Sequence, residues 1–269
     1  MLLVTAYPVA YSFWLSLFRY DLRFPDQREF IGLGNYLTVL GSETWWQSLF
    51  NTLLITLGSV SVELVLGFVF ALVMHHSLVG RRWVRTSLLV PYGIITVVAA
   101  MSWRFAFDPT TGFVNALLGL EGAWLSDRWS AFFVIIQAEI WKTTPFMALL
   151  LLSGLTLVPD DLLRAARVDG ANAWQRFTRV TLPLMRPVIL VALLFRTLDA
   201  FRIFDSVFIL TRGAQATESV SIVAYNTLIT RLNLGLGSAV SVLIFVCVVV
   251  IALLYIKGFG INPGRREGE

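Results

Sequence analysis

The sequence predicts an all-α membrane protein with six transmembrane helices, on the strength of its composition and the length of its apolar segments. Of its 269 residues, 57% are hydrophobic and only 14% are charged, and the mean hydropathy is +0.75. Soluble globular domains carry about a quarter charged residues, so the composition alone indicates an integral membrane protein. Several apolar segments also reach the roughly 20 residues that a helix needs to cross a bilayer.

Six apolar segments are expected to span the membrane, and polar segments separate them. The expected spans cover about 1–18, 48–74, 86–107, 129–158, 184–211 and 236–257. The polar segments cover 19–47, 75–85, 108–128, 159–183 and 212–235. The part from 219 to 235 is mixed in character and is expected to form a short interfacial helix or the start of the last span. Neither a linker nor a clear internal repeat divides the chain, so we expect a single domain over residues 1–269.

The first segment is interpreted as most of a spanning helix rather than as a cleavable signal peptide. It has no basic n-region and no small-residue cleavage site. On this interpretation, an upstream cytoplasmic tail can be missing from the sequence.

The basic residues indicate the orientation of the spans. Arginines concentrate in segments 75–85 and 159–183 and in the tail that begins at Lys257, whereas the other loops mix both signs. Because cytoplasmic loops carry an excess of Lys and Arg, the sequence predicts that both termini and segment 159–183 lie in the cytoplasm. The net charge of +4 is explained by this topology more simply than by nucleic-acid binding.

Segment 159–183 is strongly charged and is predicted to fold as a helix–turn–helix on the cytoplasmic surface. Pro159 followed by two carboxylates starts a helix. Asp169–Gly170 ends it, because glycine adopts the positive φ of a helix C-terminus. A second short helix follows, and the sequence "LPLMRP" is expected to stop it and to begin the next span.

Two interpretations of this helix–turn–helix remain open at this point. It is either an amphipathic loop on the lipid headgroups or a docking element that fits a groove in a cytoplasmic partner. Short helices, a glycine turn and an aromatic face that includes Trp174 and Phe177 favour docking, since lipid binding usually uses a longer amphipathic helix.

Charged residues inside the expected spans indicate either a structural ion-pair network or a polar cavity. Four of them recur every three residues with alternating sign in the fifth span: Arg196, Asp199, Arg202 and Asp205. This spacing predicts a ladder of ion pairs along one helix. Asp199 and Arg202 are placed nearer a polar cavity, because charges within a membrane usually face a bundle interior or a water-filled space.

The remaining charges of the spans have the same two interpretations. Glu139 and Lys142 lie three residues apart in the fourth span, where Pro145 frees a backbone carbonyl, as in helices that line a cavity. Glu63 in the second span is interpreted as paired with another helix rather than as part of a proton relay.

The sequence gives no sign of a metal site, a disulfide or a catalytic motif. His75 and His76 have no third ligand nearby, and Cys247 is the only cysteine. The P-loop, H-E-x-x-H and G-x-S-x-G motifs are all missing from the sequence. The chain is therefore expected not to be an enzyme. A stand-alone secondary transporter driven by ions, using Glu63 and the charged ladder, remains an alternative.

The stretch "RAARVDGANAWQRFTRVTLP" (164–183) resembles the EAA loop of binding-protein-dependent ABC importer permeases. The matching positions are Ala165, Ala166, Asp169, Gly170, Ala171, Phe177, Leu182 and Pro183. Further stretches are similar, in order, to the sugar branch of these permeases, which contains the larger maltose permease subunit and trehalose-type permeases. They are "FIGLGNY" (30–36), "NTL" (51–53), "WRFAFDPTTGFVNALL" (103–118), "FDSVFILTRG" (204–213) and "LGLGSAVSV" (234–242).

The resemblance implies that segment 159–183 is a coupling-helix loop seated on an ATP-hydrolysing subunit. The residues that it assigns to ATPase coupling are Arg164, Ala165, Ala166, Asp169, Gly170, Ala171, Trp174 and Phe177. The usual glutamate of the family is Arg164 here, so a carboxylate-specific salt bridge to the ATPase must be replaced or reversed in sign.

The resemblance also implies a substrate pathway and a set of partners. The positions that correspond to sugar contacts are Lys142, Thr143, Phe146, Asp199 and Arg202, with plain packing as the alternative for Phe146. The implied partners are a second permease subunit, two ATP-binding subunits and an extracytoplasmic sugar-binding protein. The last of these would dock on the outer side, where Asp108, Pro109 and Gly112 form a turn.

No cofactor is expected on this chain, because ATP and magnesium belong to the partner ATPase. The implied location is a bacterial plasma (inner) membrane. A disaccharide such as trehalose or a maltose-type sugar is the expected substrate. Glycerol phosphate is the rival, because Arg202 and Lys142 would suit a phosphate.

Overall fold

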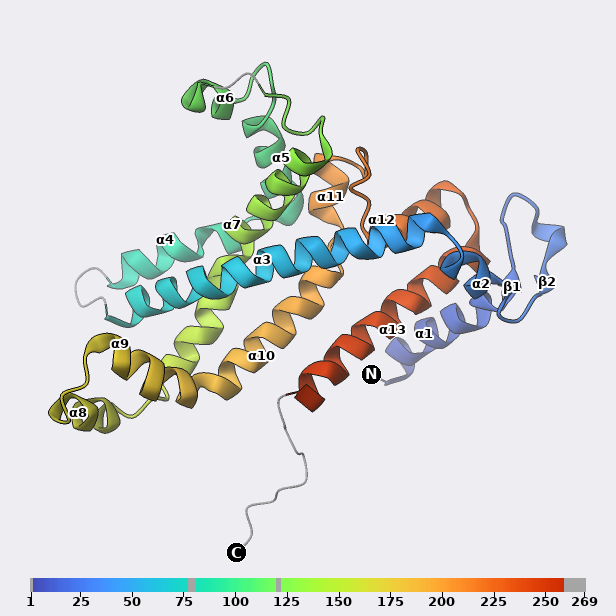
Figure 1. The fold of residues 1–269 in the computed structure, drawn as a ribbon. Helices are drawn as coiled ribbons and strands as arrows, with labels where there is room; N and C mark the ends of the chain where they lie inside the picture. The colour runs from blue at the N-terminus through green and yellow to red at the C-terminus, as the bar shows by residue number, and fades with distance from the viewer. Residues whose placement is uncertain (1, 77–80, 120–121, 259–269) are drawn as a thin grey trace, which may run out of the picture.

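The computed structural model describes residues 2–76, 81–119 and 122–258, most of which lie in helices (Figure 1). The helices are α1 (Leu2–Ser16), α2 (Gly34–Leu40), α3 (Glu43–His76), α4 (Arg81–Gly93), α5 (Thr96–Ala106), α6 (Phe113–Leu118), α7 (Arg128–Leu155), α8 (Asp160–Val168), α9 (Ala173–Arg176), α10 (Leu182–Phe201), α11 (Asp205–Leu210), α12 (Val220–Tyr225) and α13 (Leu234–Gly258). A short 3-10 turn covers Pro25–Gln27, and π-helical turns cover Phe177–Thr181 and Asn226–Thr230. The strands β1 (Phe18–Arg19) and β2 (Glu29–Phe30) form a minimal antiparallel hairpin.

Helices α3 and α7 form the most extensive helix pair, and α10 packs against both of them. The backbones of α3 and α7 come close at Gly67, where an added Cβ would lie 2.7 Å from Cγ of Met147. Buried apolar side chains gather around Ile135, around Met147 and around Phe201. The group around Met147 contains side chains of α3, α7 and α10 and packs these three helices together.

The first and last helices, α1 and α13, lie side by side at one edge of the bundle (Figure 1). The hairpin that follows α1 closes onto the start of α13, because the Gly235 N–H donates to the Tyr20 carbonyl at 3.0 Å. A Cβ at Gly235 would lie only 2.0 Å from the Phe18 carbonyl oxygen, so this close approach requires glycine.

Helices occupy all six predicted spans, but fewer of them have the length and apolarity to cross a membrane. Among the described residues these are α3, α7 and α13, or four spans if α4 and α5 are taken as one broken pair. Helix α1 has 15 described residues, and α10 carries three charges, Arg186, Arg196 and Asp199. The all-α membrane fold is therefore confirmed, whereas the count of six spans stays a prediction.

Two predicted spans are not continuous helices. The third, expected over 86–107, bends by 94° between α4 and α5. The fifth, expected over 184–211, ends at Phe201 and resumes at Asp205. The chain can break there inside the bundle because the Ile203 carbonyl accepts a hydrogen bond from Ser219 Oγ at 3.0 Å.

Segment 159–183 forms the predicted helix–turn–helix, but its second helix does not stop at Leu182–Pro183. Helix α8 ends at Val168, and Gly170 follows two residues later with a φ of +84°, in the left-handed region, as expected. Helix α9 continues through the π-turn directly into α10. Pro183 has no N–H to donate, and the wider turn accommodates it, with the Leu182 N–H reaching back to the Phe177 carbonyl.

Some sequence predictions lie outside the described residues. They are residues 77–80 of the predicted cytoplasmic segment 75–85 and the tail 259–269 with Arg265 and Arg266. Of the described polar segments, α8, α9 and the start of α4 lie toward one end of the bundle, and the hairpin and α2 lie toward the other (Figure 1).

Candidate functional site

A buried ion-pair cluster centred on Arg196 joins α3, α7 and α10. Its Nε and Nη2 lie 2.6 and 3.0 Å from the two carboxylate oxygens of Glu63. Nη2 also lies 3.2 Å from Glu139, and Nη1 lies 3.0 Å from Asp199. The side chains of Arg196 and Glu63 are 1% and 0% exposed, so this bidentate pair is fully removed from solvent.

Hydroxyl groups complete the cluster. Thr143 Oγ1 donates to Glu63 at 2.8 Å, and Ser206 Oγ at the start of α11 donates to Glu139. Two buried carboxylates thus share one guanidinium, and the hydroxyl donors offset part of the cost of burying the second negative charge. The cluster fixes the relative positions of four helices.

The cluster corrects two pairings predicted from sequence spacing. The ladder along the fifth span is reduced to its first step, Arg196 with Asp199, because the helix ends before Arg202 and Asp205. Glu139 pairs with Arg196 instead of Lys142. The interpretation of Glu63 as a residue paired with another helix is confirmed.

A cavity of about 570 Å³ lies directly against this cluster. The broken span contributes Tyr92, Ile94, Ile95 and Thr96, α7 contributes Glu139, Lys142 and Thr143, and the α10–α11 region contributes Asp199 and residues 202–206. The Asp199 side chain is 64% exposed, so its carboxylate is available to a ligand even though it contacts Arg196.

Four of the five predicted pathway residues line this cavity: Lys142, Thr143, Asp199 and Arg202. Phe146 does not line it. Its ring stacks on that of Tyr92, with the centroids 5.5 Å apart and the planes 19° from parallel. The aromatic residues that line the cavity are Tyr92 and Phe204. Sequence reasoning missed Tyr92, although the helix-breaking sequence Pro91-Tyr92-Gly93 inside an apolar span was an available signal.

Lys142 also binds the backbone of the broken span. Its Nζ donates to the Ile94 carbonyl at 2.5 Å and lies 3.4 Å from the Tyr92 carbonyl. The same ammonium lies 5.8 Å from the centre of the Tyr92 ring.

The predicted coupling residues lie together at one end of the bundle, on α8, the turn after it, α9 and the start of the following π-turn (Figure 1). Trp174 is 70% exposed and Val168 is 87% exposed, so the loop presents apolar side chains outward. Arg164, Ala165, Asp169 and Gly170 are also exposed, whereas Ala166, Ala171 and Phe177 are half-buried. The Phe177 ring packs edge-on against Phe68 of α3 at 5.8 Å, which ties the loop to the bundle.

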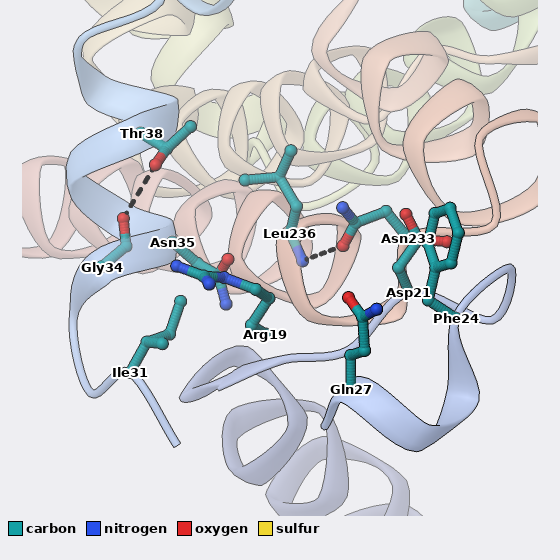
Figure 2. A pocket seen from close by; sticks show the side chains of 10 residues that line it. All are labelled: Arg19, Asp21, Phe24, Gln27, Ile31, Gly34, Asn35, Thr38, Asn233 and Leu236. Atoms are coloured by element: carbon teal, nitrogen blue, oxygen red, sulfur yellow. Dashed lines mark hydrogen bonds between the residues drawn. The ribbon is translucent and has the colours of Figure 1, made fainter. Parts of the chain in front are cut away.

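A second cavity, of about 420 Å³, lies at the opposite end between the hairpin, α2 and the start of α13 (Figure 2). Figure 2 shows the Gln27 side chain pointing into it, with Asp21 and Phe24 at one side. Hydrogen bonds from Arg23 lower the pKa of Asp21 to about 2. Asn35 donates to the Ser16 and Phe18 carbonyls at 2.8 Å each, so this region joins α1 to the rest of the fold.

The turn predicted at Asp108, Pro109 and Gly112 is present. The Asp108 carboxylate accepts from the backbone and hydroxyl groups of Thr110 and Thr111, and these hydrogen bonds hold the pKa of Asp108 well below its usual range. A Cβ at Gly112 would lie 2.4 Å from the Asp108 carbonyl, so the turn requires glycine there.

Residues 63–259 match the family of binding-protein-dependent transport system inner membrane components. The chain belongs to this family. It is thus a membrane permease component of an ABC importer, a transport subunit rather than an enzyme. Within the described ranges, no group of three or more His, Cys, Asp or Glu could hold a metal ion.

Two similar permeases are named for the transport of disaccharides. The permease is 56% identical to the trehalose transport system permease protein SugA of Mycobacterium tuberculosis, over 97% of this chain and 85% of the relative. It is 43% identical to the trehalose/maltose transport system permease protein MalF of Thermococcus litoralis, over 93% and 86% of the two chains.

A solved structure has the same fold as the permease. It is a bacterial ABC transporter involved in the import of the acidic polysaccharide alginate, with a TM-score of 0.84 and 23% identity, over 97% of this chain and 92% of that one. A second structure of a bacterial alginate transporter, in complex with an alginate pentasaccharide-bound periplasmic protein, gives a TM-score of 0.78 at 24% identity, over 88% and 84%.

Proposed function

We propose that this permease forms half of the translocation pathway of an ATP-driven disaccharide importer, with trehalose or a maltose-type sugar as substrate. The observation that carries the proposal is the cavity beside the Arg196 cluster. It combines the Tyr92 ring with hydroxyl, carboxylate and cationic groups on three separate segments. Polar groups suit sugar hydroxyls and an aromatic face suits the C–H surface of a sugar ring. The two relatives named for trehalose support the same substrate.

The charges of the cavity favour a neutral sugar over glycerol phosphate. Three carboxylates line it, Glu139, Asp199 and Asp205, against two cations, Lys142 and Arg202. Lys142 is already occupied with backbone carbonyls. A phosphate is usually bound by several arginines or by a helix N-terminus, and here it would meet an excess of negative charge.

Glu63 argues against an ion-coupled transporter. Its carboxylate is buried and accepts two hydrogen bonds from Arg196 and one from Thr143. A proton relay needs a carboxylate that is free to exchange protons with water, and this one is held as a structural group.

The helix–turn–helix at 159–183 supports coupling to a separate ATPase. Its exposed Trp174 and Val168 provide an apolar anchor, and the left-handed turn at Gly170 fixes the angle between α8 and α9. In this proposal the loop contacts one of two ATP-binding subunits, which carry ATP and magnesium. The proposed site consists of the eight coupling and five pathway residues predicted from the sequence, together with Tyr92. Of the five, Phe146 acts by stacking on the ring of Tyr92.

The remaining partners follow from the same proposal. A second permease subunit completes the wall of the cavity. An extracytoplasmic sugar-binding protein docks at the end opposite to α8 and α9. The chain spans a bacterial plasma membrane six times as a single domain with both termini in the cytoplasm, in agreement with the arginines that gather at the end of α8, α9 and the start of α4.

Uptake of radiolabelled substrate by proteoliposomes tests the proposal. The complex is reconstituted with its binding protein outside and ATP inside, and trehalose, maltose and glycerol 3-phosphate are compared. ATP-dependent uptake of trehalose or maltose is expected. Uptake of glycerol 3-phosphate and of neither sugar would show that the substrate is a glycerol phosphate and not a disaccharide. Uptake driven by an ion gradient without ATP would overturn the proposal of ATP-driven import.

A further inference from the structure

The bend between α4 and α5 exposes backbone carbonyls within a segment that is apolar enough to lie in a membrane. A straight helix would pair these carbonyls with N–H groups four residues later, and the bend removes those partners. Unpaired carbonyls in a bilayer are costly, so broken helices occur where other groups satisfy the freed backbone.

Lys142 provides such a group from the neighbouring helix α7. Its ammonium has three donors and no acceptor, and two carbonyls of the bend, those of Tyr92 and Ile94, lie 3.4 and 2.5 Å away. The carbonyl end of a helix carries partial negative charge, so a cation is the favoured cap for the end of α4.

The surroundings of Lys142 direct its charge toward the bend. Glu139, the carboxylate one turn earlier on α7, is already paired with Arg196 and Ser206. Phe146, one turn later on α7, stacks on the ring of Tyr92. Lys142 and Phe146 therefore hold Tyr92 at its carbonyl and at its ring, and both contacts come from one face of α7.

We infer that Lys142 is a positioning residue that keeps the α4–α5 span bent, so that Tyr92 and Ile94–Thr96 form one wall of the cavity. This inference deepens the proposed function and rests on it for the role of the cavity. Loss of the ammonium lets the span straighten and removes the Tyr92 wall from the pathway.

The bend is measured by electron–electron double resonance between spin labels on its two arms, in the assembled complex in nanodiscs. Trp83 on α4 and Phe105 on α5 are 78% and 59% exposed and serve as label sites after replacement by cysteine, in a background without Cys247. A rise of about 1.5 Å per residue separates the labelled backbone positions by about 20 Å in the bent span and about 30 Å in a straight one.

Three variants decide the inference: Lys142→Met, Lys142→Arg and, as a matched control, Lys257→Met, which changes the only other lysine. Lys142→Met is expected to lengthen or broaden the distance distribution and to lower sugar-stimulated ATPase activity by about tenfold, the effect of losing a hydrogen bond to a charged donor. Lys142→Arg retains donors and is expected to keep the wild-type distance distribution and ATPase stimulation. Lys257→Met is expected to change neither quantity.

An unchanged distance distribution in Lys142→Met overturns the inference, and lost sugar stimulation with an unchanged distance assigns Lys142 to substrate contact alone. If Lys142→Met does not assemble, Lys142→Gln replaces it, and the same distance criterion applies to that variant. If no sugar stimulates the ATPase activity of the wild-type complex, the proposed function is contradicted. The label distances still decide the role of Lys142 in that case.

Discussion

Arg196 is the residue on which the centre of the permease depends. It is almost fully buried and contacts carboxylates from α3, α7 and its own helix. Removing one partner of a buried ion pair leaves the other charge without compensation, which typically costs about 3–5 kcal/mol. That cost reflects the uncompensated charge rather than a net gain from the intact pair. The pair of Arg196 and Glu63 therefore contributes to the geometry of the cavity more than to net stability.

Arg196→Met should destabilise the permease by about 3–5 kcal/mol, because Glu63 and Glu139 would remain buried without a cation. Thermal unfolding of the complex in nanodiscs measures the loss. Arg186→Met, an exposed change on the same helix, is the matched control and should have little effect. The double variant Glu63→Gln, Arg196→Met should be more stable than Arg196→Met alone. Equal stability of Arg196→Met and Arg186→Met would contradict this account.

Asp199 should affect the response to substrate more than the fold, because its carboxylate is exposed to the cavity. Asp199→Ala is expected to lower sugar-stimulated ATPase activity by about tenfold, the effect of one lost charge-assisted hydrogen bond, and to leave basal activity close to wild type. Steady-state ATPase assays with and without sugar-loaded binding protein measure both quantities. An equal loss of both activities would make Asp199 a structural member of the Arg196 cluster.

At this scale the sequence could identify residue types but few partners. Asp199 and Arg202 line a polar cavity, as predicted, and Thr143 lies in the lining beside them. The ladder of charges was drawn along one helix because spacing reveals only neighbours three or four residues apart. Arg196 pairs with Glu63, which is 133 positions away and is brought close only by the packing of α10 against α3.

At the scale of elements, the turn at Gly170 joins two short helices and has a defined backbone requirement. Gly170 has a φ of +84°, and its N–H donates to the Arg167 carbonyl at 3.1 Å. An added Cβ would meet nothing within 4 Å, so only the backbone conformation restricts this position.

Gly170→Pro should abolish most transport while the permease still folds, because proline fixes φ near −65° and removes the N–H. Gly170→Asn, which tolerates the left-handed conformation, should retain transport and serves as the control. Sugar uptake by proteoliposomes and co-purification of the ATPase measure the effect. Normal uptake by Gly170→Pro would reject the coupling role of segment 159–183.

The elements also mark where prediction from sequence reached its limit. Helix starts and stops with local signals, such as Pro159 and Gly170, were predicted correctly. The break after Phe201 was missed because its donor, Ser219, comes from a distant segment. The 94° bend after α4 was missed although Pro91 and Gly93 are local helix breakers, because its carbonyls are capped by Lys142 of another helix. Hydropathy describes such stretches as continuous spans, since it records composition and not hydrogen bonding.

At the scale of the whole molecule, the helix–turn–helix, the Arg196 cluster and the hairpin cavity lie at different places along the bundle. The helix–turn–helix occupies one end, the hairpin and its cavity occupy the other, and the Arg196 cluster lies on helices that connect them (Figure 1). Helix α10 is continuous through the π-turn with α9, so the second helix of the predicted coupling loop and Arg196 belong to one helical stretch. In the proposed function, this stretch would connect the ATPase-facing end to the cavity.

The central claim is that this permease couples a disaccharide pathway to a separate ATPase. It is tested most directly by the ATPase activity of the co-expressed complex in nanodiscs, with its binding protein and a panel of trehalose, maltose and glycerol phosphates. The account predicts that an ATPase co-purifies and that trehalose or maltose stimulates its activity through the binding protein. The absence of a co-purifying ATPase, or an activity that no disaccharide stimulates, would contradict it.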